Sequence, residues 1–408
     1  AYNEADPDVD DLDALRAAVG VRVIDEYTLE ITTPYRAPFM ANILGMWMAA
    51  AQPQWLVEEV GDFWTEPENI QSYGPYALKE WFHDDSLTLI ANPFWPGTDA
   101  IPKPQIQEIY GVMLTEASAA FANYEAGTLD VVPDPPLAEL DRIMADPVLS
   151  EELFIGPRMC TYYYGFNVTK APVDNVHMRR ALSYAIDRQA LIDNVLKGGQ
   201  EPARWFARPG LVASPEMDTH PDLGIGYDPV RAQEELALAL EDMGLASVAD
   251  LPPITLMFNT SEAHARIAEA IQQMWANELG IDVQITNQEW GVYLETLNVD
   301  PPQIWRLGWC QDYPDAHSFT NDVFRSDSGN NHTMWGNPEF DALMDQALLL
   351  EDQDERRELY AQAEQILVYE DAAIAPIYWY TLLQMTKPYV ERTYEKYGSP
   401  AFEKWSFK

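Results

Sequence analysis

The sequence predicts an α/β protein built from at least two lobes. The chain has 408 residues, whereas a single hydrophobic core stops growing at roughly 250–300 residues. Hydrophobic residues make up 47% of the chain, which excludes a disordered protein. In the second half, expected strands alternate with expected helices, an order typical of an α/β lobe.

The chain begins with short elements separated by prolines and glycines. The acidic segment Asp8 to Leu15 is interpreted as a helix start. Tyr27 to Thr33 alternates apolar and polar residues, as a half-buried strand does. Ser72 to Trp81 places a Gly-Pro turn before an alternating run, and Leu87 to Ala91 follows a polar turn. These last two segments predict a hairpin.

The next elements surround a proline-rich segment. Glu116 to Ala126 is expected to form a helix that Gly127 ends, and Leu129 to Val132 a short strand. Proline cannot donate to a sheet, so Pro133 to Pro136 cannot belong to a central strand. Tyr162 to Asn167 predicts an aromatic strand.

The second half reads as alternating helices and strands. Val176 to Val195 has apolar residues at helical spacing and precedes Gly198 and Gly199, which predicts one helix. The later elements are expected helices Asp228 to Met243, Glu262 to Leu279, Glu339 to Leu350 and Glu355 to Tyr369, and expected strands Ile254 to Phe258, Asp282 to Thr286 and Ala373 to Tyr380. No repeat of 20–50 residues occurs, which disfavours solenoids and propellers.

The charge balance is strongly acidic. The chain has 25 Lys+Arg and 66 Asp+Glu, a formal net charge of −41. Such a surface repels phosphates, which argues against nucleic acid and anionic membranes as partners. No run approaches the ~20 apolar residues that span a bilayer. A basic start followed by an apolar run is absent from the N-terminus, so no signal peptide is visible.

Motifs of catalysis and of metal binding are missing from the sequence. There is no G-x-S-x-G, HExxH, GxxxxGK[ST] or GxGxxG pattern, and the six histidines lack metal-ligand spacing. We therefore expect no catalytic residue, metal or cofactor. Cys160 and Cys310 lie outside any CxxC pair. They are either two free thiols or one long-range disulfide.

The densest cluster of chemistry-bearing residues is the run from Ile304 to Tyr313, with the sequence IWRLGWCQDY. In one interpretation it is an irregular strand in which Arg306 and Asp312 pair with each other. In the other it is a ligand wall, where Asp312 holds an ammonium, Arg306 holds a carboxylate and the indoles supply apolar area. Gly308 would let a ligand backbone approach closely. Buried unpaired charges are costly, so an empty site should be open and wet.

These residues carry a family resemblance. The pattern R-x-G-W-C-x-D-Y, here Arg306 to Tyr313, resembles the signature of the oligopeptide-binding proteins of ABC importers, which belong to the family 5 (cluster C) solute-binding proteins. Further segments agree with the family in order and spacing: NIQSYGPYALKEW from Asn69, CTYYYGFN from Cys160, APVDNVHMRRALSYAID from Ala171, FNTSEAH from Phe258, NQEWGVYL from Asn287, and Ala375 to Val390. The resemblance covers nearly the whole chain.

The resemblance implies a periplasmic-binding-protein-like fold, in which two α/β lobes joined by a hinge close over the ligand and a small extra domain is added. Residues 1–53 would be a remnant of the extra domain. Residues 54–159 with 380–408 would form the first lobe, and 160–379 the second lobe with the ligand wall. Family members carry further residues and a signal peptide before the point that matches Ala1, so we expect the N-terminal part of the fold to be missing.

The family also implies which residues hold the two charged ends of a peptide. Asp312 would pair with the α-ammonium, while Arg306 and His264 would offer charge to the C-terminus. The backbone of Gly308 and Cys310 would bind the peptide as an added strand.

Four aromatic side chains and one disulfide are implied in the same way. Trp290 and Trp309 would shape side-chain pockets, and Tyr163 and Tyr378 would lie near the ligand. The two cysteines match those of the family, which implies a Cys160–Cys310 disulfide and an oxidising compartment.

One segment departs from the family pattern. Where peptide receptors often carry an asparagine pair that binds peptide backbone, this chain reads Pro133 to Pro136, with Asp134 between prolines. Proline removes a donor, so we expect less backbone pairing on that side, and either a different ligand length or a ligand that is not a plain oligopeptide.

The resemblance implies an extracytoplasmic, non-enzymatic receptor that captures short peptides and delivers them to the membrane permease subunits of an ABC importer. A monomeric, periplasmic protein is expected. The alternatives are the same fold binding a murein peptide, an opine, a nickel chelate or haem, or a peptide hydrolase. The Asp312 motif disfavours metal chelates, which need no ammonium anchor.

Overall fold

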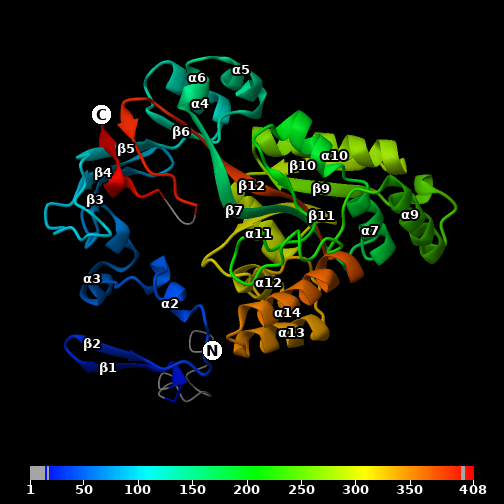
Figure 1. The fold of residues 1–408 in the computed structure, drawn as a ribbon, viewed down its shortest axis with the longest axis horizontal. Helices are drawn as coiled ribbons and strands as arrows, with labels where there is room; N and C mark the ends of the chain where they lie inside the picture. Colours follow the sequence, from blue (N-terminus) through cyan, green and yellow to red (C-terminus); the bar gives the residue numbers. More distant parts are fainter. Residues whose placement is uncertain (1–13, 16–17, 397–399) are drawn as a thin grey trace.

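A seven-stranded mixed sheet forms the centre of the molecule (Figure 1). Its strands follow the order β10-β9-β11-β7-β12-β6, and β8 pairs with β12. The computed structural model describes residues 14–15, 18–396 and 400–408. The strands of this sheet are β6 (Val131–Pro133), β7 (Leu153–Phe166), β8 (Glu201–Pro202), β9 (Ile254–Asn259), β10 (Val283–Gln288), β11 (Ile304–Cys310) and β12 (Ile374–Thr386).

Helices cover both faces of this sheet, because strands buried on both sides need two apolar layers. The first layer packs around Tyr162, and the second packs around Tyr163 and Trp305. Helices of the first layer are α7 (Val176–Tyr184), α8 (Arg188–Leu191), α9 (Pro229–Met243) and α10 (Glu262–Leu279). Helices of the second layer are α11 (Trp290–Val299), α12 (His317–Phe324), α13 (Pro338–Leu349) and α14 (Gln353–Gln365).

Smaller sheets and helices lie outside the central sheet. One three-stranded antiparallel sheet contains β3 (Tyr76–Phe82), β4 (Ser86–Ala91) and β5 (Glu108–Val112). Two-stranded sheets are formed by β1 (Val21–Asp25) with β2 (Thr28–Ile31), and by β13 (Val390–Glu391) with β14 (Ser406–Phe407). The remaining α-helices are α2 (Met40–Ile43), α3 (Gln54–Val60), α4 (Ala117–Glu125), α5 (Leu140–Ala145) and α6 (Leu149–Glu152). Every residue of β1 and β2 is exposed.

Most elements expected from the sequence are confirmed. The hairpin forms as β3 and β4, with Phe82 opposite Ser86. The expected helix at Glu262 to Leu279 matches α10 at both ends. Of the helix start expected at Asp8 to Leu15, residues 8–13 lie outside the described residues, and Ala14 and Leu15 are helical.

The single helix expected over Val176 to Val195 is wrong, because the chain breaks after Tyr184. Asp187 caps a new helix by accepting a hydrogen bond from the Ala190 amide at 2.9 Å. Arg188 is buried at the break, and its guanidinium donates to the carbonyls of Ser183, Ile186 and Pro376. The side chain thus donates to two carbonyls at the end of the broken helix and, in addition, to one carbonyl of β12.

Two strands are much longer than expected and cross the whole sheet. β7 has 14 residues and β12 has 13, and they pair antiparallel from Leu153 with Met385 to Gly165 with Ile374. Their register shifts between Pro376 and Tyr378, and again between Trp379 and Thr381. The second of these shifts, between Trp379–Thr161 and Thr381–Pro157, lies where the sequence placed the lobe boundaries at 159/160 and 379/380. We therefore keep that division as a proposal, with β7 and β12 running through both lobes.

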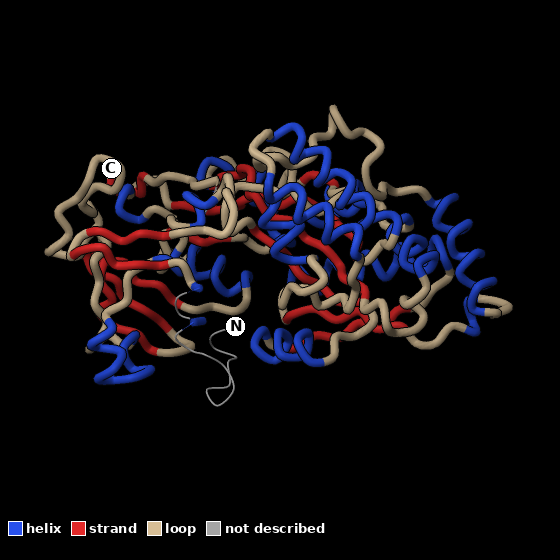
Figure 2. Tube along the Cα trace, turned by 90° about the horizontal axis from the view of Figure 1, so that it is seen from below, coloured by secondary structure: helices blue, strands red, loops and turns tan. Residues whose placement is uncertain are grey.

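Figure 2 views the molecule from below and separates two regions. The C-terminus lies in the region of the small antiparallel sheets, where Ile106, Val390 and Trp405 form a small core. The helix-covered central sheet fills the other region. This arrangement leaves a hollow between the α4–β6 segment and the ends of β11 and α10, which is where the site lies.

Candidate ligand-binding site

A cavity of about 1450 Å³ opens between the two regions. On one side its wall comes from β5, α4, β6 and the C-terminal segment, and on the other from β11, β12 and the N-terminal end of α10. Ser118 in α4 donates a hydrogen bond of 2.6 Å to Glu262 in α10, so the two sides touch across the cavity. Six of the residues singled out from the sequence line it: Trp290, His264, Arg306, Gly308, Cys310 and Tyr378. Asp312, Trp309 and Tyr163 do not.

Arg306 is the central cation of the cavity. Its side chain is 93% removed from solvent, since only 7% remains exposed. Nη1 donates to Asn259 Oδ1 at 3.0 Å, Nη2 donates to the Tyr380 hydroxyl at 2.5 Å, and the guanidinium lies 4.4 Å from the centre of the Tyr162 ring. Its electrostatic neighbours are tyrosines, and none of the described carboxylates forms an ion pair with it. The pairing of Arg306 with Asp312 that was one interpretation of the sequence is therefore wrong.

His264 lies beside Arg306 as a neutral group. Its ring centre is 5.6 Å from that of Tyr162, and its Nδ1 has no hydrogen-bond partner among the described residues. Burial, together with the neighbouring Arg306 charge, lowers the pKa of His264 to about 2. The expectation that His264 offers a charge does not hold for the ligand-free protein, because a second buried cation beside Arg306 is too costly.

Three tyrosines form an aromatic wall around Arg306. Tyr162 stacks on Tyr378 at 4.8 Å, and Tyr380 lies 5.0 Å from Tyr378, between ring centres. Tyr163, which was expected here, instead packs into the core on the opposite face against Phe206. Successive side chains of a strand point to opposite faces, so Tyr163 lies on the face of β7 opposite Tyr162 and Arg306. The alternation of the Tyr162–Tyr164 run signals two faces but not which face holds the ligand.

Gly308 keeps the contact between Arg306 and Tyr380 possible. A Cβ at this position would lie 3.0 Å from the Tyr380 hydroxyl oxygen and 3.3 Å from Arg306 Nη2. β11 pairs with β7 along its whole length, but with β9 only at Ile304 and Trp305. The far edge of β11 beyond Trp305 therefore has no strand partner in the described part of the chain.

The Cys160–Cys310 disulfide is present, as the family resemblance implied. The two cysteines face each other in the register of β7 and β11. The bond ties the end of β11 to β7, and Cys310 itself lines the cavity. It thereby anchors the strand that carries Arg306 and Gly308.

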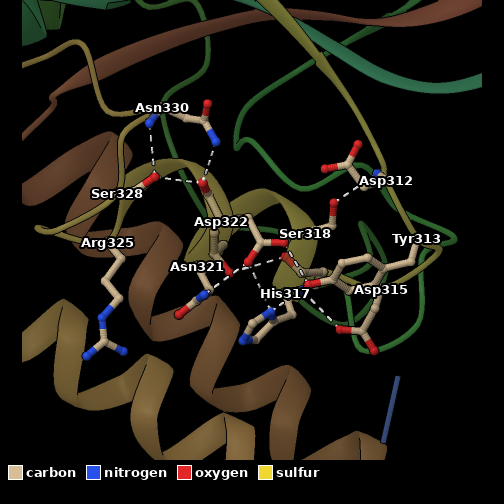
Figure 3. Close-up of polar contacts among 12 residues, drawn as sticks. Asp312, Tyr313, Asp315, His317, Ser318, Asn321, Asp322, Arg325, Ser328 and Asn330 are labelled. Carbon is tan, nitrogen blue, oxygen red and sulfur yellow. Dashed lines mark hydrogen bonds and ion pairs between the residues drawn. The ribbon is translucent and has the colours of Figure 1, made fainter. Parts of the chain in front are cut away.

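Asp312 lies beyond the end of β11, in the loop that leads to α12 (Figure 3). Its side chain is exposed, and its backbone amide donates to Ser318 Oγ at 3.0 Å. Although the side chain is exposed, partial desolvation by nearby protein atoms and the Asp322 charge raise the pKa of the Asp312 carboxyl. Trp309 is held by the same residue, because its indole Nε1 donates to the Ser318 carbonyl at 2.8 Å.

A network behind Asp312 holds this loop in place. The Tyr313 hydroxyl donates to Asp322 at 2.7 Å and lies 2.8 Å from Nδ1 of His317. Asp315 forms a buried two-point ion pair with Arg356, at 2.7 and 2.8 Å. In Figure 3 the Asp312 carboxylate points away from this network. Fixed in this way, the loop presents Asp312 to solvent.

Trp290 lines the cavity from the start of α11. Glu289 caps this helix by accepting from the amides of Gly291 and Val292, at 2.8 and 3.3 Å. The indole remains 47% exposed, as expected for a surface that a ligand would cover.

Two further findings concern metals and membranes. The described residues contain no group of three or more His, Cys, Asp or Glu side chains that could hold a metal ion. Across the same residues, every helix is too short or too polar to cross a bilayer.

The fold and cavity define the class of two-region α/β solute-binding proteins. Residues 4–331 match the bacterial extracellular solute-binding proteins, family 5, middle region, and the chain belongs to this family. The resemblance inferred from the sequence is confirmed.

Named relatives refine this assignment. The chain is 34% identical to the oligopeptide-binding protein OppA of Bacillus subtilis over 89% of the chain and 66% of the relative. It is 31% identical to the periplasmic murein peptide-binding protein MppA of Escherichia coli, over 91% of the chain and 67% of that protein. The chain thus spans about two thirds of the length of these curated relatives.

A solved structure agrees with the fold. The crystal structure of Haemophilus influenzae OppA in complex with the peptide RPPGFSPFR matches with a TM-score of 0.85 and 29% identity. The match covers 97% of this chain and 77% of that one.

Proposed function

We propose that the protein is an extracytoplasmic receptor that captures short peptides and delivers them to the membrane permease of an ABC importer. Arg306 carries this proposal. A guanidinium that is buried in a large cavity without a carboxylate partner among the described residues is costly. A ligand carboxylate would complete its pairing. Relatives named as oligopeptide-binding proteins support peptides as the ligand class.

In this proposal the peptide lies along the unpaired edge of β11. The backbone of Gly308 and Cys310 would hydrogen-bond it as an added strand, which gives affinity that does not depend on the peptide sequence. Arg306 would bind the C-terminal carboxylate, and neutral His264 would donate one hydrogen bond. The α-ammonium would reach Asp312, two residues beyond Cys310.

The aromatic side chains would supply apolar area. Tyr378, with Tyr162 and Tyr380, would bound the ligand near Arg306, and Trp290 would form the wall of a side-chain pocket. Trp309 is proposed to act indirectly, because its indole is bonded to the Ser318 carbonyl, next to the Asp312 loop. A murein peptide is the second candidate ligand, supported by the 31% identity with MppA.

We also propose that the protein acts as a monomer in the periplasm and that its partners are the permease subunits of the importer. The relatives named periplasmic binding proteins support the location and a binding role rather than a catalytic one. Mass spectra of a tripeptide incubated with the protein check the binding role. Intact peptide is expected, and fragments would indicate a hydrolase.

Thermal shift against free and N-acetylated tetrapeptides tests the ligand. Free peptides should raise the melting temperature, and acetylated peptides should do so much less, because acetylation removes the ammonium that Asp312 would bind. Native mass spectrometry of the purified protein should show retained peptides. If no peptide shifts the melting temperature and none is retained, the proposal is wrong.

A further inference from the structure

An ion pair inside the cavity has no role in the scheme above. Asp134 and Arg158 both line the cavity, and Asp134 Oδ2 lies 3.8 Å from Arg158 Nη1. This distance exceeds that of a hydrogen bond, so the two side chains attract each other without locking together. Neither side chain forms a side-chain hydrogen bond within the described residues. Both groups are thus available to a ligand.

Asp134 is held rigidly. Its φ of 48° lies in the left-handed region, which few residues other than glycine adopt. A residue that precedes a proline is normally extended, and here Pro135 follows and is buried. The Asp134 amide donates to the Leu383 carbonyl at 2.9 Å, and Pro133 pairs with Gln384 in β12. Such strain persists only where the surroundings impose it, so the backbone that carries this short side chain has a fixed place.

Arg158, in contrast, can move. Its side chain is 40% exposed and ends a long flexible stem. The guanidinium also lies 5.9 Å from the centre of the Tyr380 ring, so it has a cation–π contact in addition to Asp134. A fixed carboxylate beside a mobile cation therefore forms a site whose cation can be exchanged.

Asp134 is poorly solvated where it stands. Its side chain is 62% exposed to the cavity, yet protein surrounds it closely enough that burial raises its pKa, while Arg158 lowers it. A second, closer cation would stabilise the carboxylate further.

We propose that Asp134 selects ligands with a cationic side chain, an amine or a guanidinium. In the empty site, Arg158 occupies the position that the ligand cation would take. The inference rests on the proposed peptide-binding function. A cation entering the site displaces only a flexible side chain. An anion at the same place would be repelled by the Asp134 carboxylate.

The test is calorimetric titration with tetra-alanine peptides that carry one lysine at each position in turn. Each is matched by a norleucine peptide, which has the same straight chain without the amine. The wild-type chain is compared with Asp134→Asn, Arg158→Gln and the control Glu151→Gln. Glu151 is exposed and does not line the cavity. Asparagine tolerates the left-handed conformation well, so Asp134→Asn should fold.

At one position, lysine should bind the wild-type chain roughly two- to fivefold more tightly than norleucine, the size expected for a partly exposed charge pair. Asp134→Asn should abolish this preference and leave norleucine binding unchanged. Arg158→Gln should strengthen lysine binding a few-fold, because it removes the competing cation. Glu151→Gln should behave like the wild type.

Three outcomes would overturn the inference. The first is an equal loss in Asp134→Asn and Glu151→Gln, which would show only a long-range effect of net charge. The second is weaker lysine binding in Arg158→Gln. The third is norleucine peptides that bind the wild type as tightly as lysine peptides, which would leave the receptor function standing. If no peptide binds the wild type at all, the proposed function fails and this inference with it.

Discussion

The charge state of a basic residue in the cavity depends on its partners as well as on its burial. Arg306 keeps its charge deep in the protein because Asn259, Tyr380 and the Tyr162 ring together surround its guanidinium. His264 also lies against the Tyr162 ring and is neutral, because its pKa is lowered. Arg306 is therefore charged and His264 neutral, since Arg306 has partners for its charge whereas no described residue offers one to His264.

Replacing Arg306 tests the carboxylate anchor. Arg306→Met should weaken binding of a tetrapeptide with a free C-terminus by about 2–5 kcal/mol, because a buried charged partner is lost. The matched peptide with an amidated C-terminus should change little between the two proteins. Isothermal titration measures both. Equal losses for the free and the amidated peptide would show that Arg306 does not bind the carboxylate.

Glu364 is a second residue whose state depends on burial. The side chain is fully buried, where it accepts hydrogen bonds from the amides of Phe206 at 2.9 Å and Ala207 at 2.6 Å. Burial raises its pKa to about 7, although these two amides lower it. The unfolded chain, with a pKa near 4.5, loses this proton first.

The pH dependence of stability follows from this difference. The stability that protonated Glu364 contributes is fully present below pH 4.5 and is lost as pH rises through about 7. In urea unfolding, the free energy of unfolding of the wild type should therefore fall relative to that of Glu364→Gln, by roughly a few kcal/mol, as the pH rises over this range. A constant difference between the two proteins from pH 4.5 to 8 would contradict the assignment.

At the scale of elements, charged side chains join helices to the sheet. The break between α7 and α8 is stabilised by Arg188, whose guanidinium reaches the Pro376 carbonyl in β12 at 2.7 Å. The helix end and the long strand are therefore fixed relative to each other. β12 then carries Tyr378 and Tyr380 into the cavity.

Removing that connection should cost stability. Arg188→Met leaves the carbonyls of Ser183, Ile186 and Pro376 without their donor, which should lower the free energy of unfolding by roughly 2–4 kcal/mol. The control is Arg142→Met, whose partners Glu125 and Glu139 form exposed pairs worth less than about 1 kcal/mol. Urea denaturation compares them. Similar losses in both variants would refute the role given to Arg188.

The whole molecule is shaped by its charge. A net charge of −41 makes the folded surface repel itself, while the cavity wall has six acidic and five basic residues. Basic residues are thus concentrated at the site relative to the rest of the protein. The surface repels anions, and the cavity nevertheless offers them Arg306.

Salt should therefore stabilise the fold. Raising NaCl from 10 mM to 1 M shortens the screening length from about 30 Å to about 3 Å, so the melting temperature should rise by several degrees. Because some salts also stabilise proteins by exclusion, most of the rise should occur below about 0.2 M. A melting temperature that falls or stays level over this lower range would contradict self-repulsion as a major term.

Local patterns in the sequence determined the class of fold, most elements and the family. The hydrophobic period of an element and the residues that cap or end it are properties of neighbouring residues. For this reason α10, the β3–β4 hairpin and the capped start of α9 at Asp228 were predicted closely. The R-x-G-W-C-x-D-Y pattern likewise pointed to Arg306 and to the disulfide. Both are present, and Arg306 lines the cavity.

The tertiary structure alone decided which faces and partners these residues have. Tyr162 rather than Tyr163 packs against Arg306 because the register of β7 between β11 and β12 sets its two faces. Tyr380 reaches Arg306 from a strand 74 residues away. The neutrality of His264 and the rigid place of Asp134 depend on burial and on distant strands. Desolvation and long-range pairing are sums over groups far apart in the chain, so no local pattern could reveal them.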